Sequence, residues 1–146
     1  MPTFFTGNNS NTLTYHSVTV TNIELFGDQE GTIDFTVGDC NISAFFYGET
    51  FTVGEKFEAI ISQLDYGLEW DIIFSENAEK QKRLDPSPGL CSYYGYGCIE
   101  SINPVIANFG CVRLHLGDWT NDERVVGEYI YWKVERLDIS RMNPKP

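Results

Sequence analysis

Alternation of apolar and polar residues, the pattern of half-buried β-strands, runs through most of the chain. In residues 15–26, Val18 and Val20 alternate with polar residues. The apolar phase then shifts by one at Asn22 and continues with Ile23 and Leu25, as a β-bulge would produce. Breakers separate the further predicted strands, which are residues 32–37, 41–47, 56–64, 68–74, 92–102, 105–109, 112–116 and 128–137.

A single helix is predicted at residues 76–84. Ser75 before it is a good N-cap residue, and the segment has acids in its first turn and bases in its last, which matches the helix dipole. The Asp-Pro-Ser-Pro-Gly sequence at residues 85–89 would end the helix.

The spacing of these elements indicates the fold class. Short strands every 8–12 residues or so, with one helix inserted midway, resemble an OB-like barrel. A Val-Gly-Glu turn precedes a long strand at residues 53–55 and again at 126–128, a device frequent in small Greek-key barrels. We therefore predict a mostly β chain. It would form one domain over residues 1–146, a small Greek-key or OB-like β-barrel with one short inserted α-helix. Residues 1–12 would be a flexible arm and residues 142–146 a flexible tail.

The sequence LCSYYGYGCIE at residues 90–100 is crowded with tyrosines, glycines and cysteines. As a strand, it places on one face the residues Cys91, Tyr93, Gly95, Gly97 and Ile99. The two glycines leave a strip that suits a sharp bend or a large side chain crossing over, such as Trp70 or Trp132. The alternative is a platform on which bases stack, but its expected basic groove is missing.

Charge is distributed unevenly along the chain, whose net charge is −11. Residues 1–73 contain eleven acids and one base, a net charge of −10, whereas residues 74–146 contain ten acids and nine bases, a net charge of −1. A field of one sign attracts positively charged partners and repels polyanions. Nucleic acid is therefore disfavoured as a partner, because its binding depends on Lys and Arg.

No motif for catalysis or cofactor binding occurs, so we predict no catalytic residue, no cofactor and no enzymatic activity. Glu69 and Asp71 would share a strand face about 6–7 Å apart, a spacing compatible with paired glycosidase acids, but no second feature supports that role. The cysteine spacings of 51, 7 and 13 residues lack the close pairs of a zinc site, and no calcium loop is present. No metal site is predicted.

The cellular compartment is expected to be the cytoplasm. The first residues lack the features of a signal peptide, and no apolar run is long enough for a membrane span, so no membrane association is expected. In this reducing compartment the four cysteines, Cys40, Cys91, Cys98 and Cys111, are expected to be free and buried thiols. A disulfide and a structural zinc site are the alternatives.

These features favour a protein inhibitor of something basic. Enzymes that bind phosphates have positive clefts, which clustered carboxylates with aromatic anchors complement. The predicted partner-binding residues are Asp28, Glu30, Asp39, Glu49, Asp65, Glu69, Asp71, Asp118 and Trp119. In size, acidity and barrel architecture the chain resembles the bacterial immunity proteins that neutralise polymorphic or contact-dependent toxins. The resemblance covers the general character of the whole chain, and no motif carries it. It implies an antitoxin that binds a basic toxin domain, such as a nuclease.

Two other functions remain open. A barrel that binds a small ligand or an oligosaccharide would use Tyr94, Tyr96 and Trp119 as a stacking surface, and a deep apolar pocket would favour it. An OB-type module for single-stranded nucleic acid would need the basic residues of the second half of the chain on one face. These are Lys80, Lys82, Arg83, Arg113, Arg124, Lys133, Arg136, Arg141 and Lys145.

Overall fold

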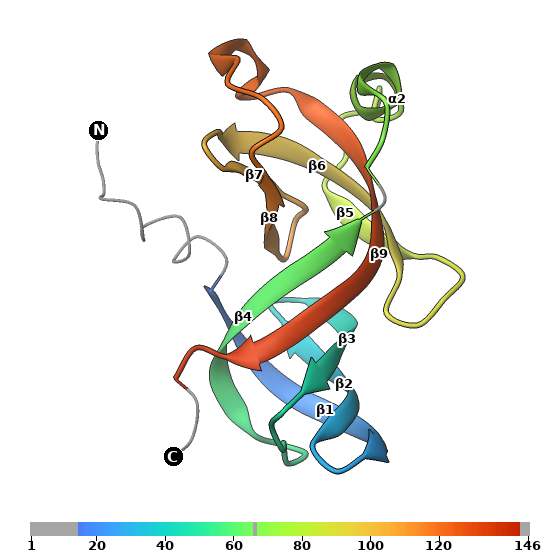
Figure 1. The fold of residues 1–146 in the computed structure, drawn as a ribbon, viewed down its shortest axis with the longest axis vertical. Coiled ribbons are helices and arrows are strands. Elements are labelled where there is room, and N and C mark those ends of the chain that lie inside the picture. The colour runs from blue at the N-terminus through green and yellow to red at the C-terminus, as the bar shows by residue number, and fades with distance from the viewer. Residues whose placement is uncertain (1–14, 66, 144–146) are drawn as a thin grey trace.

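The computed structural model describes residues 15–65 and 67–143. The predicted arm at residues 1–12 lies outside the described residues, as do residues 144–146 of the predicted tail. The described chain is mostly β, with one sheet and one lone α-helix (Figure 1). Its elements are β1 (Tyr15–Gly27), β2 (Glu30–Val37), β3 (Cys40–Tyr47), β4 (Lys56–Asp65), α2 (Trp70–Ser75), β5 (Arg83–Pro86), β6 (Tyr93–Ser101), β7 (Val105–Asn108), β8 (Arg113–Gly117), the 3₁₀ helix η1 (Glu123–Val125) and β9 (Tyr129–Arg141).

The strand order in the sheet is β3-β2-β1-β4-β9-β6-β7-β8, with β5 paired to β6. Neighbouring strands in this order run antiparallel. In addition, β3 pairs with β9 in parallel at Phe45 and Asp138. Strands β1, β2, β3, β9 and β4 are therefore joined in a cycle of pairings. Figure 1 shows β9 running from this group to the group of β6, β7 and β8 near α2.

The predicted β-bulge is confirmed. The register between β1 and β2 shifts between Val20 and Asn22, where the apolar phase of the sequence changes. Val18 and Val20 before the shift are buried. Beyond the shift Ile23 packs against the core, whereas Leu25 is 63% exposed, so the bulge keeps only part of the second apolar phase on the core side.

The two faces predicted for β6 are also confirmed. Gly95 and Gly97 lie on its buried face, and a large side chain crosses the strip that they leave. That side chain is Phe109, and not Trp70 or Trp132 as we expected. A Cβ atom added to either glycine would lie 2.8 Å from the ring of Phe109, so the strip accommodates this ring and little else.

The predicted helix at residues 76–84 and the predicted strand at residues 68–74 are both wrong. The helix is α2, and residues 83–86 form strand β5. Ile73 and Phe74 pack against the apolar core, and Trp70 one turn earlier packs on Phe74, an arrangement that helical spacing allows. Residues 76–84 have almost no apolar side chain to bury, and favourable caps and charges alone do not stabilise so short a helix.

The expectation of four free thiols is wrong as well. Cys40 at the start of β3 forms a disulfide with Cys111, which lies between β7 and β8, and their Cα atoms are 6.2 Å apart. Cys91 is buried and Cys98 is partly buried, and both are free. The bond joins residues separated by 71 positions, a proximity that exists only once the sheet has formed.

Thiol titration tests this disulfide. Protein purified and unfolded without reductant is expected to have two reactive thiols, and reduction should raise the number to four. In the folded protein Cys98 should react before Cys91, because burial raises the pKa of the Cys91 thiol to about 11 and leaves it almost without thiolate near neutral pH. Four reactive thiols before reduction would contradict the disulfide.

Candidate functional site

A cavity of about 340 Å³ lies where the end of β4, α2 and the segment after β8 meet. All three tryptophans of the chain, Trp70, Trp119 and Trp132, line it. Two carboxylates, those of Asp65 and Asp118, line it too. Its volume is within the range of small-ligand sites, which begins at about 300 Å³.

The aromatic rings form a continuous cluster from the core to the surface. Trp119 stacks on Trp132 with ring centroids 5.7 Å apart, and Trp70 meets Trp119 edge-on at 5.4 Å. Phe74 packs 5.4 Å from Trp70. Trp132 is buried, whereas Trp70 is 49% exposed, so the aromatic wall extends from the core out to solvent. These distances are those of favourable aromatic pairs.

The loop that carries Trp119 is fixed by local hydrogen bonds. Thr120 is buried, and its hydroxyl accepts a hydrogen bond from the backbone N–H of Asp122. Asp122 in turn caps η1 by accepting from the backbone N–H of Arg124. The Arg124 guanidinium lowers the pKa of Asp122 to about 2, so this cap stays charged. The loop therefore presents Trp119 in a defined position.

Hydrogen bonds link the deep end of the cavity to one of its carboxylates. Trp132 Nε1 donates to Gln63 Oε1 at 3.2 Å, and Gln63 Nε2 donates to Asp65 Oδ2 at 2.8 Å. The other oxygen of Asp65 accepts from the backbone N–H of Gly67. In contrast, the buried Nε1 of Trp119 has no hydrogen-bond partner among the described residues. Asp65 is thus held in place, and Trp119 has a donor in need of an acceptor.

The arginines of the chain are all occupied by its own acids. The ion pairs are Arg83–Asp85, Arg113–Glu100, Arg124–Asp122, Arg136–Asp138, and Arg141 with both Glu49 and Glu55. Within residues 15–65 and 67–143, no ion pair includes Asp65 or Asp118. The described lining of the cavity contains these two acids and no base, so its charged groups are all negative.

Five of the nine predicted partner-binding residues lie at or near this cavity. Asp65, Asp118 and Trp119 line it. Glu69 and Asp71 flank Trp70 in the chain, and both are exposed. They do not share a strand face as expected, because they lie at the start of α2, where residues two apart point in different directions.

The other four predicted residues lie elsewhere. Asp28 lies in the β1–β2 turn and Glu30 begins β2, and Figure 1 shows this turn at the opposite end of the molecule from α2. Asp39 is exposed in the β2–β3 turn, next to the disulfide. Glu49 is 15% exposed and pairs with Arg141, so it does not contribute to an exposed acidic surface.

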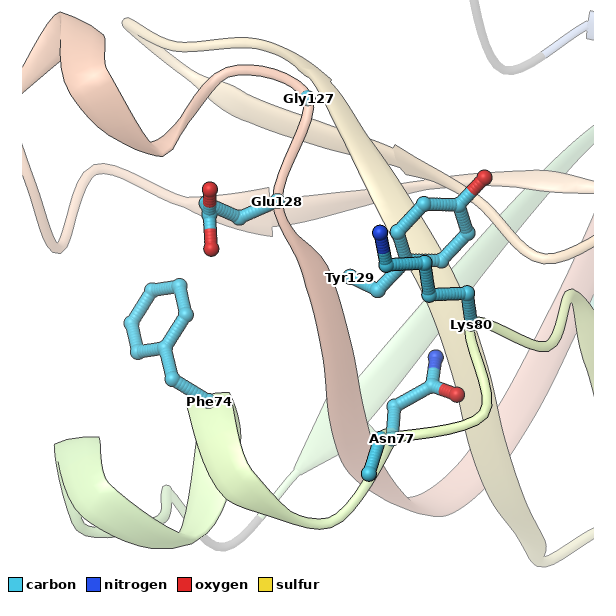
Figure 2. A pocket seen from close by; sticks show the side chains of 7 residues that line it. Phe74, Asn77, Lys80, Gly127, Glu128 and Tyr129 are labelled. Atoms are coloured by element: carbon cyan, nitrogen blue, oxygen red, sulfur yellow. The ribbon is translucent and has the colours of Figure 1, made fainter.

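A second cavity, of about 250 Å³, lies between the end of α2 and the start of β9 (Figure 2). Phe74, Lys80, Glu128 and Tyr129 line it together with Asn77. The Asn77 side chain is buried, donates to the backbone oxygens of Gln81 and Ile130, and accepts from the N–H of Gln81. Because the backbone satisfies the buried amide of Asn77, this side chain fixes the loop after α2, and we assign the cavity no binding role.

Sequence reasoning did not find the cavity itself, nor the roles of Gln63, Trp70 and Trp132 in it. One signal was present. Two of the three tryptophans are directly next to acids, in Glu69-Trp70-Asp71 and in Asp118-Trp119. That pattern gives the residue types of the site but not their proximity.

Comparison of the chain with protein-family models, with curated proteins and with solved structures finds no match. None of the helices in the described part of the chain has both the length and the apolar character that a membrane crossing requires. The described residues also contain no group of three or more His, Cys, Asp or Glu arranged to hold a metal ion. The function is therefore argued from the chemistry of the cavity and its surroundings.

Proposed function

We propose that this chain is an acidic protein inhibitor, of the immunity or antitoxin type, that binds and neutralises a basic toxin such as a nuclease. The observation that carries the proposal is the tryptophan cavity, with Asp65 and Asp118 in its lining and no base among the described lining residues. Glu69 and Asp71 extend the negative charge over the neighbouring surface.

Interface energetics support this choice of site. Binding energy in protein complexes is concentrated in a few buried anchors, among which Trp and Arg are enriched. A half-exposed Trp70 packed against Trp119 provides aromatic surface for such an anchor. The surrounding carboxylates would accelerate encounter with a positive cleft and disfavour acidic partners.

The cycle of pairings through β1, β2, β3, β9 and β4 supports a finer proposal for the fold. We infer that these strands form an OB-like Greek-key barrel, because the Phe45–Asp138 pair between β3 and β9 closes their pairings into a cycle. Strands β5 to β8 and α2 would then form an insertion between β4 and β9. The cavity lies where this insertion joins the barrel.

A toxin inhibitor acts where the toxin would reach its target, so we propose a cytoplasmic location. The Cys40–Cys111 disulfide is unusual in that compartment. Titration of the thiols in protein isolated under conditions that trap them decides whether the disulfide forms in the cell.

The test of the function expresses the products of the neighbouring reading frames and takes a basic domain that is toxic to cells as the partner. We expect the purified chain to abolish that domain's activity in a stoichiometric complex. The association rate should fall about tenfold or more as salt rises from about 50 to 500 mM, because screening shortens the range of electrostatic steering. A chain that leaves the domain active, or whose association ignores salt, contradicts the proposal.

The volume of the cavity favours a second candidate, a module that binds a small ligand or an oligosaccharide. Its predicted stacking surface is divided, because Trp119 lines the cavity whereas Tyr94 and Tyr96 do not. Tyr96 instead packs against Tyr131 on the other face of β6. Nucleic-acid binding has less support still, because all five arginines pair with acids of the chain.

A further inference from the structure

We propose that the tryptophan cavity binds the guanidinium group of an arginine side chain inserted by the basic partner. This inference rests on the proposed function and adds the chemical group that is recognised. It comes from a pattern that the chain repeats internally and that the cavity leaves incomplete.

Three arginines of the chain each combine an aromatic face with a carboxylate. The guanidinium carbon lies 4.4 Å from the ring centroid in each case, and the three groups are Arg83 with Tyr96 and Asp85, Arg136 with Phe45 and Asp138, and Arg141 with Phe51, Glu49 and Glu55. Arg141 is the most enclosed, with a side chain that is 6% exposed. The planar guanidinium suits such sites because it stacks on a ring while its edge donates to carboxylate oxygens.

The cavity supplies the same two components without the cation. Its rings are tryptophans, which attract cations more strongly than other aromatic residues do. Asp65 and Asp118 supply the carboxylates, and the described lining includes no Lys or Arg. Of the cation–ring contacts among the described residues, none involves a tryptophan. A positive group from outside would complete the arrangement.

The ligand is expected to be arginine within a polypeptide, because the proposed partner is a protein. A small probe of the site should therefore retain both amide groups that flank the side chain in a chain.

Titration of the intact chain with Nα-acetyl-L-arginine amide, followed by tryptophan fluorescence, tests the inference. All three tryptophans line the cavity, so the signal reports directly on it. The matched control is Nα-acetyl-L-citrulline amide, which has the same shape and no charge. We expect the arginine compound to bind with a Kd of about 1–10 mM. The Kd of the citrulline compound should be higher by a factor of about ten or more.

Variants then test whether both carboxylates of the cavity bind the guanidinium group. Asp118→Asn and Asp65→Asn should each weaken the arginine compound about threefold or more, whereas Glu24→Gln, on the exposed part of β1, should not change it. Asp118 is exposed and in no ion pair of the described chain, so its variant is expected to fold, as circular dichroism can verify. Equal binding of the two compounds, or no binding of the arginine compound, overturns the inference.

The outcomes separate this inference from the proposed function. If the chain inhibits a basic partner but does not bind the arginine compound, the function stands and the guanidinium site is rejected. If it binds the arginine compound and inhibits no basic protein, the guanidinium site stands and the inhibitor function is rejected.

Discussion

Replacement of Arg141 by methionine is expected to lower the free energy of unfolding by about 3–5 kcal/mol. The Arg141 side chain is 6% exposed, and it bonds to Glu49 at 3.1 Å and to Glu55 at 2.5 Å. It also donates to the backbone oxygen of Thr50 at 2.8 Å. Without it, two carboxylates that are 15% and 14% exposed would lose the guanidinium that both of them bind. Urea unfolding monitored by circular dichroism measures the effect.

A triple variant serves as the control. Arg141→Met combined with Glu49→Gln and Glu55→Gln removes the charges together with the cation, so it should recover a substantial part of the lost stability. A loss below about 1 kcal/mol for Arg141→Met alone would show that this ion pair behaves like an exposed one, contrary to its burial.

The second large effect is expected at the glycine strip of β6. Gly97→Ala should cost about 3 kcal/mol, because the new Cβ would lie 2.8 Å from the backbone oxygen of Asn108 and 2.8 Å from Phe109. Gly95→Ala should cost somewhat less, since its closest contact is the far edge of the Phe109 ring at 2.8 Å. Urea unfolding again provides the measurement.

A second substitution distinguishes the two glycines. Phe109→Leu should compensate much of the cost of Gly95→Ala, because it removes the ring at 2.8 Å and leaves the backbone oxygen of Trp132 at 3.1 Å from the new Cβ. It should compensate little of the cost of Gly97→Ala, because the backbone oxygen of Asn108 stays in place. Equal compensation in both backgrounds would contradict the contacts described for the strip.

Features set by local pattern could be predicted from the sequence. The alternation of apolar residues, its change of phase at Asn22 and the two faces around Gly95 and Gly97 depend on the period of two in a strand, which the sequence displays directly. The helix was misplaced because capping and charge preferences at residues 76–84 are weak compared with the burial of Ile73 and its apolar neighbours.

Features set by long-range proximity could not be predicted in the same way. The Arg141 ion pair with Glu49 joins residues 92 positions apart, and the disulfide joins residues 71 apart. The cavity likewise brings Asp65 next to Trp119 only because β4 ends where the loop after β8 returns. The sequence showed that acids and tryptophans were available for a partner site. Which of them lie together depends on strand order.

Docking of a basic partner at the acidic tryptophan cavity can be tested with two double variants of equal charge. One is Asp65→Asn/Asp118→Asn, and the control is Glu24→Gln/Glu79→Gln, whose residues are exposed and outside the cavity. The affinity of each for the basic partner domain is measured. We predict that the first pair weakens the complex by about a hundredfold or more, as expected for anchors at the centre of an interface, and that the control pair changes it by about threefold or less. Equal effects of the two pairs, or a larger effect of the control, would contradict this placement of the partner.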